Sequence, residues 1–128
     1  MKQKMTKILV INRCFSDNLG DQAIGQSMKN LLNSFNCETI IADLSTIDKK
    51  TQLVKHKDIK LHNRKNFRLA KTIKWYIKKK NSIISFLNLN LKNCDAVFFG
   101  GGELFQNNNI FPIAIYKWIK EIKKIKPN

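Results

Sequence analysis

Two loops of the sequence carry residue types from which a binding or catalytic site can be built. The loop Asn18–Asp21 comes after the apolar run Ile8–Ile11, and the loop Gly100–Glu103 follows the apolar run Ala96–Phe99. Apolar runs this short, without alternation, are typical of strands buried on both faces. Ligands of open α/β sheets bind outside the carboxyl ends of the strands. We therefore predict that the two loops open onto one pocket.

The residue types in these loops suit a hydroxyl-bearing ligand. Neither loop matches G-x-G-x-x-G or the P-loop lysine pattern, and Asp21 at a helix N-terminus would repel a phosphate. Asp21 and Glu103 are candidate catalytic residues, each as a general base for a sugar hydroxyl. Arg13 is a candidate partner for a phosphate or carboxylate group. The candidate substrate-binding residues are Asn18, Gly20, Gly100, Gly101, Gly102 and Arg13.

Each candidate also has a purely structural interpretation. Asn18 and Asp21 suit a helix cap and a turn. The three consecutive glycines allow positive φ angles and close backbone approach, but they also suit a tight turn. Glu103 and Arg13 are equally compatible with solvent-facing positions. Because one glycine is usually enough for a turn, the triple glycine favours a site.

The elements that position these loops alternate along the chain. Strands are predicted at Lys7–Asn12, Glu38–Leu44 and Ala96–Phe99, and helices at about Asp21–Phe35 and Phe111–Ile125. This order predicts an α/β domain with a short parallel sheet, Rossmann-like and three-layered, covering residues 1–128. In the first helix, an apolar stripe is formed by Ile24, Met28, Leu31 and Phe35. Gly25 is expected there for close packing of the helix on a strand.

The middle of the chain is basic. Residues 45–66 are expected to be irregular, with one weak strand candidate at Ile59–His62. A helix is predicted at Phe67–Lys80, ended by Asn81 and Ser82, before a second helical segment at Ile83–Leu91.

Charge is the dominant feature of the composition. The 128 residues carry a formal net charge of +15, with thirteen Lys/Arg residues and one acid between Lys49 and Lys80. Such an excess of positive charge is typical of proteins that bind nucleic acid, an anionic surface or an acidic substrate. Lys, Asn and Ile are abundant throughout, however, so solvated helix faces explain much of it. His56 and His62 match no motif and are interpreted as surface residues.

The cysteines and the apolar runs indicate the compartment. Cys14, Cys37 and Cys94 are odd in number and lack C-x-x-C spacing, which argues against a disulfide framework and a zinc site. No apolar run approaches the length of a membrane span, and the run Ile8–Ile11 is too short for a signal peptide. We therefore expect a cytoplasmic protein, with the inner face of the membrane as an alternative position.

Two motifs in this order resemble those of the polysaccharide pyruvyl transferase family. They are the strand–N-x-G-D–helix opening at Lys7–Ile24 and the D-A-V-x-x-G-G-G-x-L-x-Q block at Asp95–Gln106. K-x-K-P at Lys124–Pro127 lies where that family would begin its next strand. The resemblance covers the N-terminal portion of the family's usual length, and residues 45–91 match by position only.

The resemblance implies a fold, a reaction and partners. The fold would be the N-terminal half of a two-domain, GT-B-like structure. The reaction would transfer pyruvate from phosphoenolpyruvate, the donor substrate, to two hydroxyls of a surface polysaccharide as a ketal, without a further cofactor. Asn18, Gly20, Asp21 and the loop Gly100–Glu103 would line the acceptor side of the interdomain cleft. The acceptor would be a sugar or lipid-linked oligosaccharide.

The phosphoenolpyruvate-binding residues of the family belong to its second half, which has no counterpart in these 128 residues. We therefore expect this chain to be inactive or a partial enzyme by itself, and to need a C-terminal half or a partner chain. The strand Ala96–Phe99 is expected beside the first strand, with an open edge that invites self-association. Alternative functions are a nucleic-acid or anionic-surface binding module and a glycosyltransferase-like half-domain with other donor chemistry.

Overall fold

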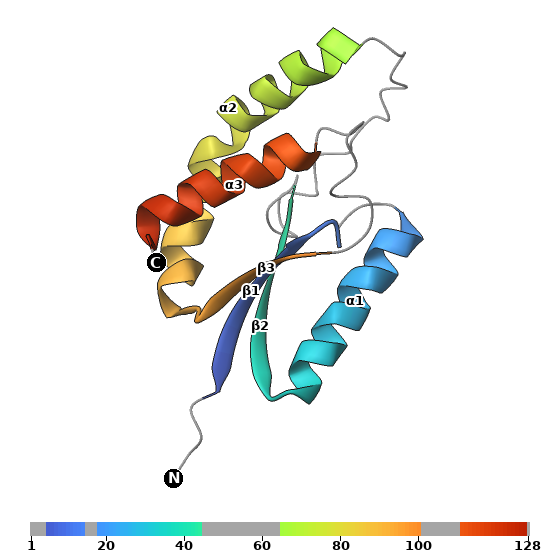
Figure 1. Ribbon diagram of the computed structural model, residues 1–128, viewed down its shortest axis with the longest axis vertical. Coiled ribbons are helices and arrows are strands. Elements are labelled where there is room, and N and C mark those ends of the chain that lie inside the picture. The colour runs from blue at the N-terminus through green and yellow to red at the C-terminus, as the bar shows by residue number, and fades with distance from the viewer. Residues whose placement is uncertain (1–4, 15–17, 45–64, 101–110, 128) are drawn as a thin grey trace.

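The computed structural model describes residues 5–14, 18–44, 65–100 and 111–127 (Figure 1). The elements are β1 (Thr6–Asn12), α1 (Leu19–Ser34), β2 (Cys37–Asp43), α2 (Lys65–Asn90), the 3-10 turn η2 (Leu91–Asn93), β3 (Ala96–Phe99) and α3 (Phe111–Ile125). The weak strand candidate at residues 59–62 and almost all of the irregular segment 45–66 lie outside the described residues.

The three strands form a parallel sheet in the order β2-β1-β3. At the carboxyl end of β1, Asn12 is paired with Asp43 of β2 and Ile11 is paired with Phe99 of β3. The expected α/β class with a short parallel sheet is therefore confirmed, and so is the position of the glycine-loop strand beside the first strand. Within the described part of the chain, no strand pairs with the outer edge of β3.

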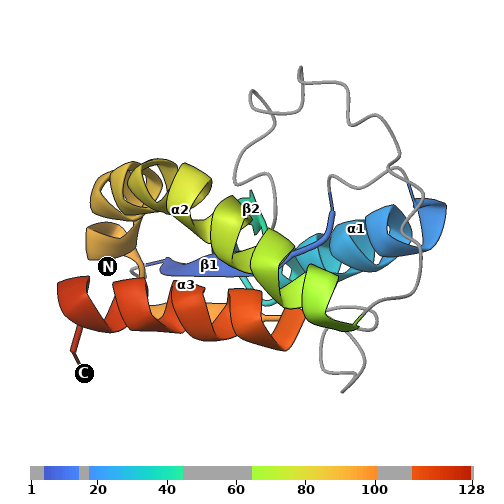
Figure 2. The ribbon, with the colours of Figure 1, turned by 90° about the horizontal axis from the view of Figure 1, so that it is seen from above.

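The helices cover both faces of the sheet. Helix α1 lies on one face, while α2 and α3 lie side by side on the other (Figures 1 and 2). The face toward α2 and α3 carries the main core, because alternate β1 residues point to that side. Its fully or almost fully buried members are Leu9, Ile11, Ala42, Leu44, Ile83, Leu87, Leu91, Cys94, Ala114, Ile115 and Trp118. The Trp118 indole N–H donates to the Leu44 carbonyl at 3.0 Å, which fixes α3 against the end of β2.

Helix α1 begins and ends with polar residues suited to those positions. The Asn18 side chain accepts a hydrogen bond from the Gly20 N–H at the N-terminus. After the C-cap Phe35, Asn36 has a φ of 62°, a left-handed conformation that asparagine tolerates better than most residues. Asp21 lies in the first turn, as predicted, where a negative charge is favoured by the helix dipole.

Helix α1 meets the rest of the domain through Gly25. Gly25 is buried, and a Cβ on it would lie 2.6 Å from the Cβ of Cys14. The expected close packing at this glycine is confirmed. The predicted apolar stripe is largely unburied, since Ile24, Leu31 and Phe35 are 39%, 58% and 71% exposed. The apolar periodicity predicted the helix correctly. Most of the apolar stripe, however, is not covered by other described residues.

The predicted break at Asn81 and Ser82 is wrong, because α2 is one continuous helix. Asparagine and serine cost at most about 0.7 kcal/mol each in a helix interior relative to alanine. Burial of Ile83 and Leu87 against the sheet outweighs this cost. Helix α3, by contrast, has the predicted bounds, with Pro112 in its first turn.

Candidate functional site

The carboxyl ends of the three strands form one rim of the sheet, which we call the carboxyl rim. Asn12 and Asp43, the last residues of β1 and β2, are both 1% exposed there. The Leu44 N–H donates to the Asn12 carbonyl at 2.6 Å, and the Gly100 N–H donates to the Ile11 carbonyl at 3.2 Å. The first loop and the start of the glycine loop therefore leave the sheet side by side.

Asp21 and Arg13 are brought together at this rim. An Arg13 Nη1 lies 3.6 Å from Asp21 Oδ2, and the two side chains are 32% and 14% exposed. The Arg13 guanidinium also lies over the ring of Phe111, 4.5 Å from its centroid. Arg13 therefore contacts the first turn of α1 and the first residue of α3 at once. A solvated loop position, the structural alternative for Arg13, does not fit these contacts.

Asn18 and Gly20 have a demonstrable structural role. The Asn18 Oδ1 accepts the Gly20 N–H at 2.8 Å, and the Asn18 carbonyl accepts the Gln22 N–H at 3.1 Å. The capping interpretation of Asn18 is thus correct, while its role in substrate binding stays a prediction. Both Asn18 and Gly20 are exposed at the rim, so capping does not remove them from contact with a ligand.

Gly100 is buried against α1. A Cβ at Gly100 would lie 2.3 Å from the Cε of Met28, so glycine permits close approach of the strand end to the helix. The φ angle of Gly100 lies outside the left-handed region, so close approach rather than backbone conformation explains this first glycine. Gly101, Gly102 and Glu103 lie outside the described residues, and their predicted roles stay predictions.

Three residues at the carboxyl rim, Asn12, Cys14 and Asp43, were not among the predicted site residues. Asn12 Oδ1 accepts the Cys14 N–H at 2.9 Å, while the buried Asn12 Nδ2 has no partner among the described residues. Burial, and then the charge of Asp43, raise the pKa of the Cys14 thiol to about 12, although a backbone hydrogen bond lowers it. Cys14 is therefore a neutral thiol at pH 7 and not a nucleophile. A polar residue at the end of β1 and of β2, Asn12 and Asp43, was the available signal.

The arrangement offers a carboxylate and a guanidinium at one edge. Asp21 is placed to accept a proton or hydrogen bond and Arg13 to contact an anionic group, whereas Asn12 Nδ2 is buried beneath Gly25 of α1. Within the described ranges, no cluster of three or more potential metal-binding side chains occurs. None of the described helices has the length and hydropathy needed to cross a bilayer.

No family model, curated protein or solved structure matches this chain.

Aromatic residues of α2 bear on the nucleic-acid alternative. Trp75 is half-buried and packs against the main core. The Tyr76 hydroxyl donates to Glu121 Oε1 at 2.7 Å, and Lys117 Nζ lies 4.7 Å from the Tyr76 ring centroid. Both rings are thus engaged within the fold, which argues against their use as stacking platforms for bases.

Proposed function

We propose that this chain is the acceptor-side domain of a polysaccharide pyruvyl transferase-like enzyme with a GT-B-like fold. The observation that carries the proposal is the Asp21 carboxylate held beside Arg13 at the carboxyl rim. The two loops whose motifs resemble that family leave the sheet side by side, and this supports the proposal. The three-layer arrangement with a parallel sheet is the coarse architecture that the proposal needs.

In the proposed reaction, Asp21 acts on the acceptor sugar. Ketal formation requires a base for the attacking hydroxyls, an acid for the methylene carbon of phosphoenolpyruvate, and cations for the departing phosphate. Asp21 supplies the base, Glu103 is a second candidate, and the backbone of the glycine loop contacts the sugar. Arg13 orients Asp21 and contributes one positive charge. The methylene acid and the remaining cations belong to a C-terminal half or partner chain.

Ligand binding by the chain alone tests the acceptor role. We expect surface-type hexoses and their oligosaccharides to shift the backbone amide NMR signals of Arg13 and Asp21. Asp21→Asn should weaken this binding at least fivefold. The control is Glu38→Gln, which removes an exposed carboxylate that pairs with Lys7 at the opposite end of β1. Shifts that spread evenly over the lysine-rich surface, or equal effects of the two variants, would refute the acceptor role.

Catalysis is tested with the other half present. A complementing C-terminal half, phosphoenolpyruvate and an acceptor panel should release inorganic phosphate, and Asp21→Asn should lower the rate by about 10²-fold or more. Absence of phosphate release across the panel would count against the transferase proposal. A ligand that co-purifies with the chain and proves by mass to be a nucleotide sugar would instead favour the glycosyltransferase-like alternative.

A nucleic-acid module remains the second candidate because α2 carries exposed lysines, including Lys78 and Lys80. Binding to single-stranded DNA that is lost between 50 and 200 mM salt would reflect charge alone. Affinity retained at high salt and abolished by Tyr76→Ala, with the fold intact by circular dichroism, would favour this candidate over the transferase.

A further inference from the structure

Positive charge is concentrated in the two helices on the main-core face of the sheet. Seven of the 26 residues of α2 and four of the 15 residues of α3 are Lys or Arg. The single acid of these two helices, Glu121, is 2% exposed and is bonded to Tyr76 and Lys124. Helix α1 on the opposite face and strand β2 contain three acids and one lysine. The net charge of +15 is therefore distributed asymmetrically over the fold.

The exposed sides of α2 and α3 combine lysines with large apolar side chains. The apolar residues Ile73, Ile77 and Tyr116 are 47%, 70% and 60% exposed. Residues three, four or seven positions apart lie on the same side of a helix, so exposed lysines accompany these residues along both helices. We define the outer helical face by the residues Ile73, Lys74, Ile77, Lys78, Tyr116 and Lys120.

The exposed sides of the two helices join into one surface. The buried residues of α2 and α3 pack toward the sheet, so their opposite sides face outward (Figures 1 and 2). Where the helices meet, Lys117 Nζ lies 4.7 Å from the centroid of the Tyr76 ring. Lys117 directly follows Tyr116, and Tyr76 directly precedes Ile77. The apolar residues of the two helices are thus brought together at this contact.

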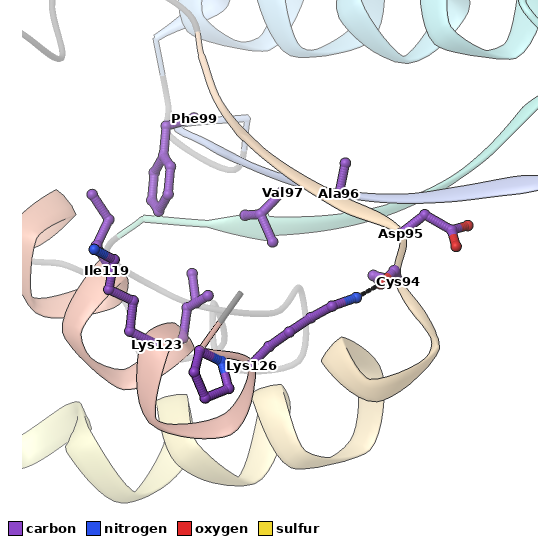
Figure 3. A pocket seen from close by; sticks show the side chains of 10 residues that line it. Cys94, Asp95, Ala96, Val97, Phe99, Ile119, Lys123 and Lys126 are labelled. Carbon is purple, nitrogen blue, oxygen red and sulfur yellow. Dashed lines mark hydrogen bonds between the residues drawn. The ribbon is translucent and has the colours of Figure 1, made fainter.

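The flank of α3 next to β3 is a different surface. There Ile119 lines a small groove opposite Val97 and Phe99 (Figure 3). Lys126 extends along this groove and donates a hydrogen bond to the Cys94 carbonyl. The outer helical face lies on another side of α3, so a further strand that paired with β3 would not cover it.

The residue types of the outer helical face suit the surface of an anionic phospholipid bilayer. Lysine ammonium groups are attracted to anionic head groups, while the apolar stems of the lysines lie beside apolar residues that enter the head-group region. Tyrosine is enriched at the same depth of the bilayer.

Other classes of partner use only part of this surface. Nucleic acid would contact the lysines but would gain no base stacking from isoleucine, and Trp75 and Tyr76 are engaged within the fold. A second copy of the chain would oppose lysine with lysine. The apolar side chains come from two helices and alternate with lysines, a pattern that suits a fluid lipid surface better than the fixed side chains of a protein.

We propose that the outer helical face docks this chain on a bilayer that contains anionic phospholipids. Ile73, Ile77 and Tyr116 enter the head-group region, and the surrounding lysines contact lipid phosphates. The docking does not rest on the proposed acceptor role. Because Phe111, the first residue of α3, lies beneath the Arg13 guanidinium, the docked surface ends beside the carboxyl rim, where a lipid-linked sugar would be presented.

Co-sedimentation with vesicles tests the contribution of charge. At about 150 mM NaCl, we expect vesicles with about 30% phosphatidylglycerol to bind the chain at least tenfold more tightly than vesicles of phosphatidylcholine alone. Lys120→Glu should weaken this binding by about tenfold. Lys29→Glu makes the same charge change in α1, on the opposite side of the sheet, and should alter the binding less than twofold. The vesicles hold no sugar, so a failure here leaves the acceptor role of the carboxyl rim untouched.

The contribution of the apolar residues is tested separately. Ile77→Ser should weaken binding to the anionic vesicles at least fivefold. Leu31→Ser, at a position of α1 that is 58% exposed, is the matched control and should change the binding less than twofold. Ile77→Trp should shift its fluorescence to shorter wavelength when vesicles are added, and Leu31→Trp should not. Circular dichroism establishes that each variant is folded.

Equal binding to the two kinds of vesicle, or equal effects of the paired variants, would overturn the proposal. Tighter binding to single-stranded DNA or to polyglutamate than to the anionic vesicles, under the same conditions, would also overturn it. The outer helical face would then be assigned to a nucleic acid or to an acidic protein.

Discussion

At the scale of single residues, the candidate site and the packing of α1 both depend on residues at the end of β1. Arg13 contacts both Asp21 and Phe111, so one side chain joins the starts of two helices. The neighbouring Asn12 and Cys14 are packed beneath Gly25 of α1. Changes here therefore affect stability and the candidate site together, and stability must be measured before an activity loss is interpreted.

We expect Gly25→Ala to destabilise the domain by about 1–3 kcal/mol, because the added methyl group would overlap Cys14 Cβ and approach Asn12 Nδ2. Alanine would otherwise stabilise a helix interior relative to glycine. Urea unfolding measures the difference, with Ser27→Ala at an exposed position of α1 as the control. An increase in stability for Gly25→Ala would show that α1 does not pack as described.

The Cys14 thiol should react slowly in the folded protein. A pKa of about 12 in place of 9.0 lowers the thiolate fraction at pH 8 by about 10³-fold. We expect alkylation of Cys14 by iodoacetamide to be at least a hundredfold faster in urea than in the folded state, as measured by peptide mass mapping. A fast reaction in the folded state would place Cys14 outside the buried position described.

At the scale of elements, the two helices on the main-core face show what sequence patterns can and cannot resolve. The bounds of α3 followed from Pro112 and its regular apolar face. Helix α2 was divided wrongly, because Asn81 and Ser82 resemble a cap and only tertiary burial of Ile83 and Leu87 keeps the helix continuous. Intrinsic helix propensities differ little between residues, so they could not reveal that α2 is continuous.

The substitution Ser82→Pro tests whether α2 is one continuous helix or two separate helices. In a continuous α2, proline at this position removes a backbone hydrogen bond and clashes with the preceding turn, so we expect a loss of about 3 kcal/mol or more. At the first turn of a separate helix it would be tolerated. Urea unfolding followed by circular dichroism, compared with Ser82→Ala, decides between these two outcomes.

The contact between α2 and α3 should give stability a pH dependence at both extremes. Burial raises the pKa of Glu121, but hydrogen bonds from Tyr76 and Lys124 outweigh it and lower that pKa below its usual 4.5. Burial and the bond to Glu121 raise the pKa of Tyr76 from 10.0 to about 12. The Glu121 contribution is present above pH 4.5 and lost on acidification. The Tyr76 contribution is present below pH 10 and lost as pH rises toward 12.

Tyr76→Phe should remove this alkaline loss and cost about 1 kcal/mol of stability at pH 7, because it deletes the hydrogen bond to the buried Glu121. Tyr116→Phe is the matched control, since Tyr116 belongs to α3 but is 60% exposed. Unfolding curves between pH 4 and 11 provide the measurement. If both variants keep the same pH profile as the parent chain, the Tyr76–Glu121 contact does not form in solution.

At the scale of the whole molecule, the coarse fold was predictable and the composition of the site was predictable only in part. Short unalternating apolar runs indicated a parallel sheet, and the order of motifs placed β3 beside β1. Asp21 and Arg13 were identified from loop position, but their 3.6 Å contact depends on where α1 begins. Asn12 and Asp43 were placed correctly in predicted strands but were missed as site residues, because only the sheet register shows that they lie side by side and buried at the carboxyl rim.

Net charge should make stability depend on salt. With +15 at pH 7, repulsion among the lysines opposes the compact state, and screening relieves it. We expect the Tm to rise by roughly 2–5 °C between 20 and 200 mM NaCl. Thermal scans in NaCl and in sucrose, which adds no ions, separate screening from general solvent effects. A Tm that falls with NaCl would mean that favourable ion pairs dominate.

The position of β1 in the centre of the sheet also determines the order in which the protein assembles. β2 pairs with β1 after a short loop closure, whereas β3 reaches β1 across 88 residues, as the Lys7–Asp95 contact shows. The longer closure costs more chain entropy and contributes to slower folding. During synthesis, β1, α1 and β2 leave the ribosome long before α3 can cover them. The apolar side of β1 is therefore exposed to aggregation or chaperone binding until α3 has been synthesised.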